Sequence, residues 1–188
     1  MLQSPQGRVE IPTTVAIRYP GAFRVDARTP NGMLAQVFNG GEFWIQSEGA
    51  PAQTAPPQFA DEMRGAVQRD SILMLLGLAD GRLSATRLPD VTDKGRRLAA
   101  LEVKAAAMSP VTVVLDPATW LIAGLKYLMP GTPGATMEEA FSDYRDVNGL
   151  KVAFKAVVSR DGAPFIERLV SRFDVNVPLD AGLFSRPS

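Results

Sequence analysis

The sequence predicts an α+β protein that is mainly β: an antiparallel, unclosed β-barrel of about ten strands, covered by one or more helices. Apolar and polar residues alternate over many short segments, which is the period of a strand with one buried face. Turn-forming residues, chiefly glycine, asparagine and proline, separate these segments at short and even intervals. One longer segment instead repeats its apolar residues at helical spacing.

The first quarter of the chain predicts four antiparallel strands. The first runs from Arg8 to Arg18 and is interrupted at Pro12, because proline donates no hydrogen bond to a ladder. Residues 23–28 alternate cleanly and form the second strand. Residues 33–38 and 42–47 form a hairpin around a loop rich in glycine.

A single long helix is predicted from Gln58 to Leu78, after a proline-rich loop over residues 49–57. The stretch Leu73-Met74-Leu75-Leu76 is apolar all round, so we expect it to be covered on most sides. Gly77 is the predicted stop of the helix. The helix is then available to cover the hollow side of the curved sheet.

Beyond the helix the chain predicts further strands, with an irregular tail over residues 176–188. The dipeptides Asn148-Gly149 and Asp161-Gly162 tolerate the positive φ of tight hairpin turns and bound a β-meander. The strand from Trp120 to Met129 is apolar on both sides, so we expect both of its faces to be covered. The predicted strands are residues 83–92, 97–105, 111–115, 120–129, 137–144, 150–158 and 163–173.

Composition excludes several classes of function. Twenty basic and twenty acidic residues cancel, and a nucleic-acid binder would need a net positive surface. The chain has no cysteine and no histidine, which removes the commonest nucleophile–base pairs and transition-metal ligands. No stretch has the roughly 20 apolar residues that a membrane helix needs. We therefore expect a protein that is not an enzyme, has no transmembrane segment and uses no cofactor or metal.

Residues 1–188 are expected to form one domain, since this length suits a single core. The first residues lack the charged start and apolar centre of a signal peptide. The chain is therefore expected either to be cytoplasmic or to be a fragment lacking its leader or an upstream domain.

Several short motifs match patterns of a known family. Residues 20–24 and 39–45 contain a Pro-x-x-Phe start and a Gly-x-x-Trp return, and residues 115–121 contain an Asp-Pro-x-Thr turn. Residues 141–150 carry a phenylalanine-led Asp-Tyr-x-x-x-x-Gly segment, and the ending over residues 175–184 fits the same group. These segments resemble the outer-membrane lipoprotein carrier and lipoprotein-sorting (LolA/LolB-like) family.

The resemblance implies an unclosed β-barrel whose helices cover a concave side and enclose an apolar cavity for acyl chains. Such carriers are periplasmic and use no cofactor. The lipoprotein carrier has an arginine directly before the proline of its early strand, and this sequence has Tyr19 there, with Arg18 one step back. The same fold also occurs as an envelope lipid-binding or regulatory domain and as an appended domain of larger exported proteins. The alternative for this chain is therefore a protein-interaction or regulatory domain of a larger exported protein, with a core filled by its own side chains. Both alternatives stay open from the sequence.

The acyl chain of a lipid or lipoprotein is the expected ligand, with an envelope protein as a further partner. Large apolar residues suit a flexible ligand, although aromatic and methionine side chains also fill ordinary cores. The predicted ligand-binding residues are Phe23, Val25, Met33, Phe38, Trp44, Met74, Trp120 and Leu121.

Three polar groups have simpler interpretations than a site. Residues 143–149 could suggest calcium, but they fit a hairpin turn better, because an EF-type spacing would place an aspartate at Tyr144 and a glutamate at Lys155. The pairs Asp61-Glu62 and Glu138-Glu139 do not converge, so a helix start and a solvated strand are expected. The basic cluster around residues 94–97 is expected in an exposed turn, with contact to an anionic lipid head as the alternative.

Overall fold

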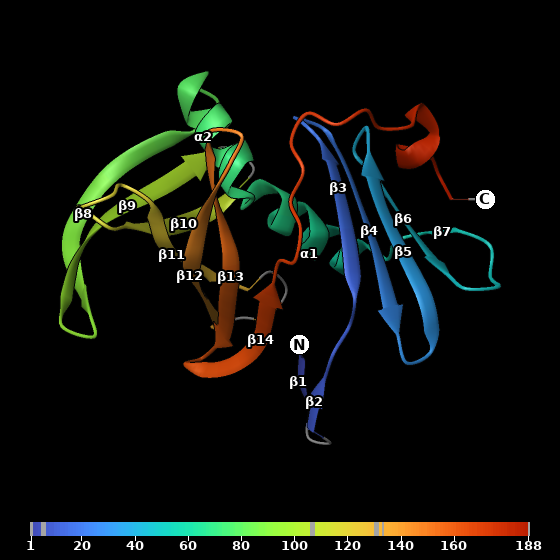
Figure 1. Ribbon diagram of the computed structural model, residues 1–188, viewed down its shortest axis with the longest axis horizontal. Helices are drawn as coiled ribbons and strands as arrows, with labels where there is room; N and C mark the ends of the chain where they lie inside the picture. Colours follow the sequence, from blue (N-terminus) through green and yellow to red (C-terminus); the bar gives the residue numbers. More distant parts are fainter. Residues whose placement is uncertain (1, 5–6, 106–107, 130–131, 133, 188) are drawn as a thin grey trace.

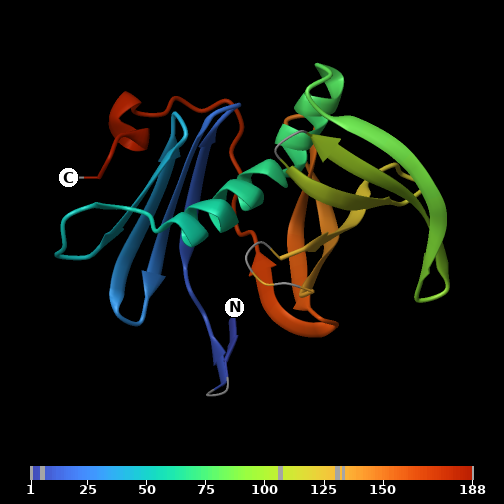
Figure 2. The same ribbon diagram turned by 180° about the vertical axis from the view of Figure 1, so that it is seen from behind.

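Two antiparallel sheets and two helices make up the fold of the protein. The computed structural model describes the chain except residues 1, 5, 6, 106, 107, 130, 131, 133 and 188. Within this described part, fourteen strands form one sheet of nine strands and one of five, side by side in Figures 1 and 2. The predicted class is confirmed: mainly antiparallel β with covering helices and no closure. The strands exceed the predicted total of about ten and divide between two sheets.

The nine-stranded sheet is strongly curved (Figure 1). Its order is β2-β1-β14-β13-β12-β11-β10-β9-β8. Register shifts interrupt four of its strand pairs, β8/β9, β9/β10, β10/β11 and β13/β14. Bulges of this kind bend a sheet, so the strands curl without closing. The bounds are β1 Leu2–Ser4, β2 Gly7–Val9, β8 Ser84–Asp93, β9 Arg96–Ala105, β10 Met108–Leu115, β11 Ile122–Leu128, β12 Thr136–Val147, β13 Leu150–Arg160 and β14 Ala163–Leu169.

The meander β12-β13-β14 follows the prediction closely. Both predicted turns have positive φ at their central residues: 51° and 86° at Asn148 and Gly149, and 48° and 80° at Asp161 and Gly162. Such turns match the twist of the flanking strands. The last strand ends at Leu169, earlier than predicted.

The five-stranded sheet has the order β3-β4-β5-β6-β7. Its first strand begins after Pro12, so the predicted interruption is confirmed. The last strand is two residues long and lies within the segment predicted as a loop. The bounds are β3 Thr13–Arg18, β4 Ala22–Thr29, β5 Gly32–Asn39, β6 Glu42–Ser47 and β7 Gln53–Thr54.

The single predicted helix is in fact two helices, α1 (Pro57–Gln68) and α2 (Ser71–Ala79). The break occurs because Asp70 caps α2: its Oδ1 accepts a hydrogen bond of 2.9 Å from the Leu73 amide. Figure 2 shows α1 crossing in front of the five-stranded sheet towards the nine-stranded sheet, where α2 follows.

Two expectations about α2 are wrong. Gly77 lies inside the helix rather than at its end, and a Cβ there would stand 2.8 Å from the Leu83 side chain. The glycine therefore allows close packing. The helix is also covered on one side only, because Leu75 and Leu76 are 59% and 43% exposed.

The strand expected from Trp120 begins later, at Ile122 of β11. Trp120 lies in the preceding turn with φ 59° and is 68% exposed. Leu125 and Tyr127 are buried, whereas Leu128 on the opposite face is exposed. The expectation that both faces are covered is therefore wrong.

The tail is anchored by a short 3-10 helix, η1 (Ala181–Phe184), in a segment predicted to be irregular. Figure 1 shows this C-terminal segment passing from the nine-stranded sheet to the five-stranded one. Phe184 is fully buried there, and the Cζ of Arg18 lies 4.9 Å from the centroid of its ring. The Phe184 carbonyl accepts a 3.2 Å hydrogen bond from the Asn39 side chain.

Candidate functional site

The candidate site is the face of the nine-stranded sheet that α2 covers, which we call the inner face. Opposite residues of antiparallel neighbours share a face, and the pairs Val103–Val111 and Val113–Leu125 place these side chains together. Met74 from α2 packs against them and is 2% exposed. We call the buried set the inner cluster; it comprises Met74, Val103, Val111, Val113, Leu125, Tyr127, Met137 and Val158.

A buried carboxylate borders the inner cluster. Glu139 on β12 is 9% exposed and accepts a 2.9 Å hydrogen bond from the Tyr127 hydroxyl. Arg168 on β14 forms an ion pair with its other oxygen. Burial, followed by the Glu139 carboxylate, raises the pKa of Tyr127 to about 12. The tyrosine therefore stays protonated and holds the carboxylate in place.

Glu139 corrects an expectation from the sequence. The pair Glu138-Glu139 was expected on a solvated strand, yet only Glu138 is exposed, where it pairs with Lys126 at 2.8 Å. Glu139 alternates with Met137 and Phe141, and all three point to the inner face. That alternation is the signal that could have revealed the buried carboxylate.

A second arginine reaches the inner cluster from the junction of the helices. The Cζ of Arg69 lies 3.7 Å from the centroid of the Tyr127 ring, a cation–π contact. Its Nε is buried and has no hydrogen-bond partner within the described part of the chain. Sequence reasoning missed Arg69, because the predicted helix ran straight through it.

The helix junction also contacts the five-stranded sheet. The hydroxyl of Tyr19, at the β3–β4 turn, donates a 2.9 Å hydrogen bond to the Asp70 carboxylate. Burial and then the Asp70 charge raise the pKa of Tyr19 well above its ordinary value. Arg69 and Asp70 therefore connect the start of α2 to both sheets.

The structure divides the predicted ligand residues of the five-stranded sheet between its two faces. Phe23 pairs with Phe38, so these side chains share a face, and Val25 on the same strand alternates onto it. Trp44 instead pairs with Val37, and Met33 pairs with Arg28, which places both on the other face.

The remaining predicted residues lie elsewhere. Met74 belongs to the inner cluster. Trp120 and Leu121 lie in the turn between β10 and β11, where Trp120 is largely exposed. The eight residues therefore form no single lining, and only Met74 lies at the candidate site.

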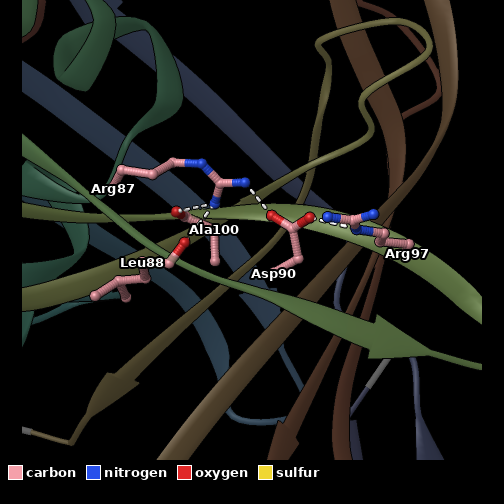
Figure 3. Close-up of polar contacts among 5 residues, drawn as sticks. All are labelled: Arg87, Leu88, Asp90, Arg97 and Ala100. Atoms are coloured by element: carbon pink, nitrogen blue, oxygen red, sulfur yellow. Dashed lines mark hydrogen bonds and ion pairs between the residues drawn. The ribbon is translucent and has the colours of Figure 1, made fainter.

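Charged side chains lie along β8, the edge strand of the nine-stranded sheet (Figure 3). Arg87 donates to the carbonyls of Leu88 and Ala100, at 2.5 and 2.9 Å, beside the bulge that precedes Val91. Arg87 and Arg97 both pair with Asp90, and these contacts hold the pKa of Asp90 below its ordinary value. A bulge and charges on an edge strand oppose pairing with another chain.

Two of the three cations of the predicted basic cluster are thus ion-paired. Besides Arg97, Arg96 pairs with Asp116 at 2.7 Å. Lys94 lies in the β8–β9 turn and is exposed. The predicted exposed turn is therefore confirmed for Lys94, whereas Arg96 and Arg97 are exposed residues at the start of β9 beside it.

A polar depression of about 240 Å³ lies beside the C-terminal tail. Its arginines hold the tail: Arg24 donates to the Leu183 carbonyl at 3.1 Å, and Arg186 donates to the Ala52 carbonyl at 2.8 Å. Polar walls of this kind do not suit an acyl chain.

Three further findings bear on the candidate site. No helix within the described residues is long and apolar enough to cross a membrane. The same part of the chain contains no group of three or more acidic, histidine or cysteine side chains placed to hold a metal. Residues 143–149, the alternative calcium loop, end in the β12–β13 hairpin turn. The Gly149 amide donates a 2.9 Å hydrogen bond to Asp146 there, and Asp146 also pairs with Lys151.

Comparison with known proteins identifies the fold. No protein-family model and no curated protein matches the sequence. A domain from Vibrio parahaemolyticus, named as an outer membrane lipoprotein-sorting protein, matches with a TM-score of 0.66 at 11% identity, over 98% of this chain and 85% of that one. A LolA superfamily protein from Nitrosomonas europaea matches with a TM-score of 0.50 at 10% identity, over 86% and 84%.

A DUF1329 family protein from Desulfovibrio piger matches with a TM-score of 0.57 at 14% identity, over 93% of this chain and 80% of that one. The chain therefore has a LolA-like fold over nearly its whole length. The resemblance found in the sequence motifs is confirmed at the level of the fold.

Proposed function

We propose that this protein is a non-enzymatic carrier of the bacterial envelope that binds the acyl chain of a lipid or lipoprotein between α2 and the inner face. The observation that carries the proposal is the pairing of a buried apolar cluster with an apolar helix that covers it and exposes two leucines. The LolA-like fold supports the same class of ligand and a periplasmic location.

In this proposal α2 is a lid, and its Met74 side chain stands where a bound chain would lie. Removing a fully buried methionine from the cluster costs about 2–3 kcal/mol, whereas each methylene of an incoming chain contributes about 0.8 kcal/mol. About four buried methylenes therefore offset the displacement of Met74, and longer chains bind with a net gain. Leu75 and Leu76 present an apolar surface where the chain first docks.

The non-enzymatic part of the proposal is supported by the surroundings of Glu139, the buried carboxylate at the inner cluster, and by the composition of the chain. Glu139 accepts from the Tyr127 hydroxyl and forms an ion pair with Arg168, so both of its oxygens have partners within the fold. The sequence offers no histidine or cysteine to complete a nucleophilic pair.

A second candidate function is an interaction domain that docks onto an envelope protein partner. The observation that favours it is the tight packing of the inner cluster by the protein's own side chains, with Trp120 exposed on the surface. In that case the core holds no ligand, and exposed apolar residues such as Trp120 contact the partner.

Native mass spectrometry of protein purified from bacterial envelope under mild conditions distinguishes the two candidates. The carrier proposal predicts an additional mass of an acyl-bearing lipid that is lost on organic extraction. Repeated preparations without lipid, combined with failure to take up added palmitate, would favour the interaction domain.

A further inference from the structure

The Arg69 guanidinium lies against the inner cluster, and no acidic side chain among the described residues forms an ion pair with it. Its Cζ is 3.7 Å from the centroid of the Tyr127 ring, and Tyr127 is itself a member of that cluster. Its Nε is inaccessible to solvent and has no hydrogen-bond partner within the described part of the chain. A buried donor without a partner is costly, so a fold that keeps one calls for a reason.

Within the described part of the chain, no carboxylate forms an ion pair with Arg69. The nearest buried carboxylate, Glu139, is already paired with Arg168 and accepts from the Tyr127 hydroxyl. Asp70, the next residue along the chain, uses its Oδ1 to accept from Tyr19 and from the amide that it caps. The inner face thus holds two arginines, and among the described residues only Arg168 is ion-paired there, which leaves the Arg69 guanidinium available to an anion from outside the protein.

We propose that Arg69 binds the anionic head, a carboxylate or a phosphate, of a single-chain amphiphile whose tail enters the inner cluster. This inference rests on the proposed function and adds the chemistry of the head group. A planar guanidinium presents parallel donors that match both oxyanions. Because Arg69 lies between α1 and α2, an occupied head-group site lies at the hinge of the proposed lid.

Other cations of the chain are less suited to this role. Arg96 and Arg97 are ion-paired at the start of β9, beside the β8–β9 turn, which lies far along the sheet from α2 in Figure 1. Arg168 is committed to Glu139. Arg69 combines an apolar neighbour with an unpartnered donor.

Isothermal titration of the purified full chain with three probes below their aggregation concentration tests the inference. Palmitate carries a carboxylate, hexadecyl phosphate carries a phosphate, and hexadecanol is neutral, while all three share one chain length. We expect at least one anionic probe to bind about tenfold or more tightly than hexadecanol. The preferred probe identifies the head group as carboxylate or phosphate.

Arg69→Met keeps the apolar stem and removes the charge. We expect it to lower the affinity of the preferred anionic probe to that of hexadecanol, while hexadecanol itself binds as to the unmodified protein. Arg69→Lys should retain part of the preference. Arg97→Met, at the exposed paired arginine, is the matched control and should change neither affinity.

Thermal unfolding of the ligand-free variants separates a binding role from a structural one. Removing an unpartnered buried donor should leave the melting temperature of Arg69→Met unchanged or raise it. A lower melting temperature together with loss of hexadecanol binding would show that Arg69 supports the fold, and would overturn the inference.

Two binding outcomes would also overturn it. Equal affinity of the three probes for the unmodified protein, or an anion preference that survives Arg69→Met, removes the head-group role and leaves the proposed acyl site intact. Failure of all three probes to bind overturns the acyl site as well.

Discussion

Met74→Ala is the substitution that most sharply separates a lid from a fixed core element. Met74 is 2% exposed and packs with the inner cluster, so its truncation should lower the free energy of unfolding by about 2–4 kcal/mol. Under the carrier proposal the same truncation removes the side chain that a bound acyl chain must displace. Palmitate affinity should therefore rise, by roughly 2 kcal/mol or about thirtyfold.

Urea unfolding and palmitate titration measure the two effects on one preparation. Leu128→Ala, on the opposite face of the nine-stranded sheet, is the matched control: Leu128 is 60% exposed, so its truncation should cost about 1 kcal/mol and leave the palmitate affinity unchanged. Lower stability without a gain in affinity would refute the idea that the chain takes the place of Met74. Unchanged stability would refute the packing argument itself.

Three further predictions concern the polar groups around α2. Glu139→Gln leaves Arg168 without its ion pair and should lower the free energy of unfolding by about 1–3 kcal/mol in urea titrations; an unchanged value would mean that the pair contributes nothing. Asp70→Ala removes the cap of α2 and the acceptor of Tyr19, at a cost of about 1–2 kcal/mol, whereas Asp70→Asn should retain most of the cap; equal loss in both would point to charge rather than capping. Because the pKa of Tyr127 is raised to about 12 in the fold, its stabilising contribution is complete below the ordinary pKa near 10 and is lost as pH rises from there through the folded value. Unfolding curves from pH 8 to 12 should thus converge for the unmodified protein and Tyr127→Phe at high pH, and parallel curves would contradict this assignment.

Local features of the fold could be predicted from the sequence. The turns at Asn148-Gly149 and Asp161-Gly162 follow from residues that accept positive φ, and the break at Pro12 follows from its missing donor. The division into two sheets could not be predicted in this way. It depends on pairings between distant segments, such as Leu2 of β1 with Ile166 of β14, which no local pattern encodes.

The scatter of the predicted ligand residues has a specific cause. The hairpin β5–β6 pairs Asn39 with Glu42, so Phe38 lies opposite Phe43 and shares its face of the sheet. Trp44 follows Phe43 along β6, so its side chain points to the opposite face. Counting residues outward from that turn along both strands is enough to separate Trp44 from Phe38. Apolar character alone selected residues of the right type on opposite faces of one sheet.

The helix junction was missed for a different reason. Apolar residues at helical spacing continue on both sides of Asp70, so periodicity predicted one helix from Gln58 to Leu78. Asp70 followed by an apolar run is also a typical N-cap, and that local signal prevails in the structure. Arg69 owes its position over Tyr127 to this break.

A reversible lock on α2 tests the central claim most directly. A Cβ at Gly77 would lie 3.7 Å from the Leu83 Cβ, a spacing that suits a disulfide, and the chain has no other cysteine. In the double variant Gly77→Cys/Leu83→Cys, the oxidised protein should bind palmitate much more weakly than the reduced protein, because the disulfide fixes the C-terminal end of α2 to the residue that leads into β8 and packs against the inner cluster. Equal palmitate affinity in the two redox states would contradict a binding site beneath this helix.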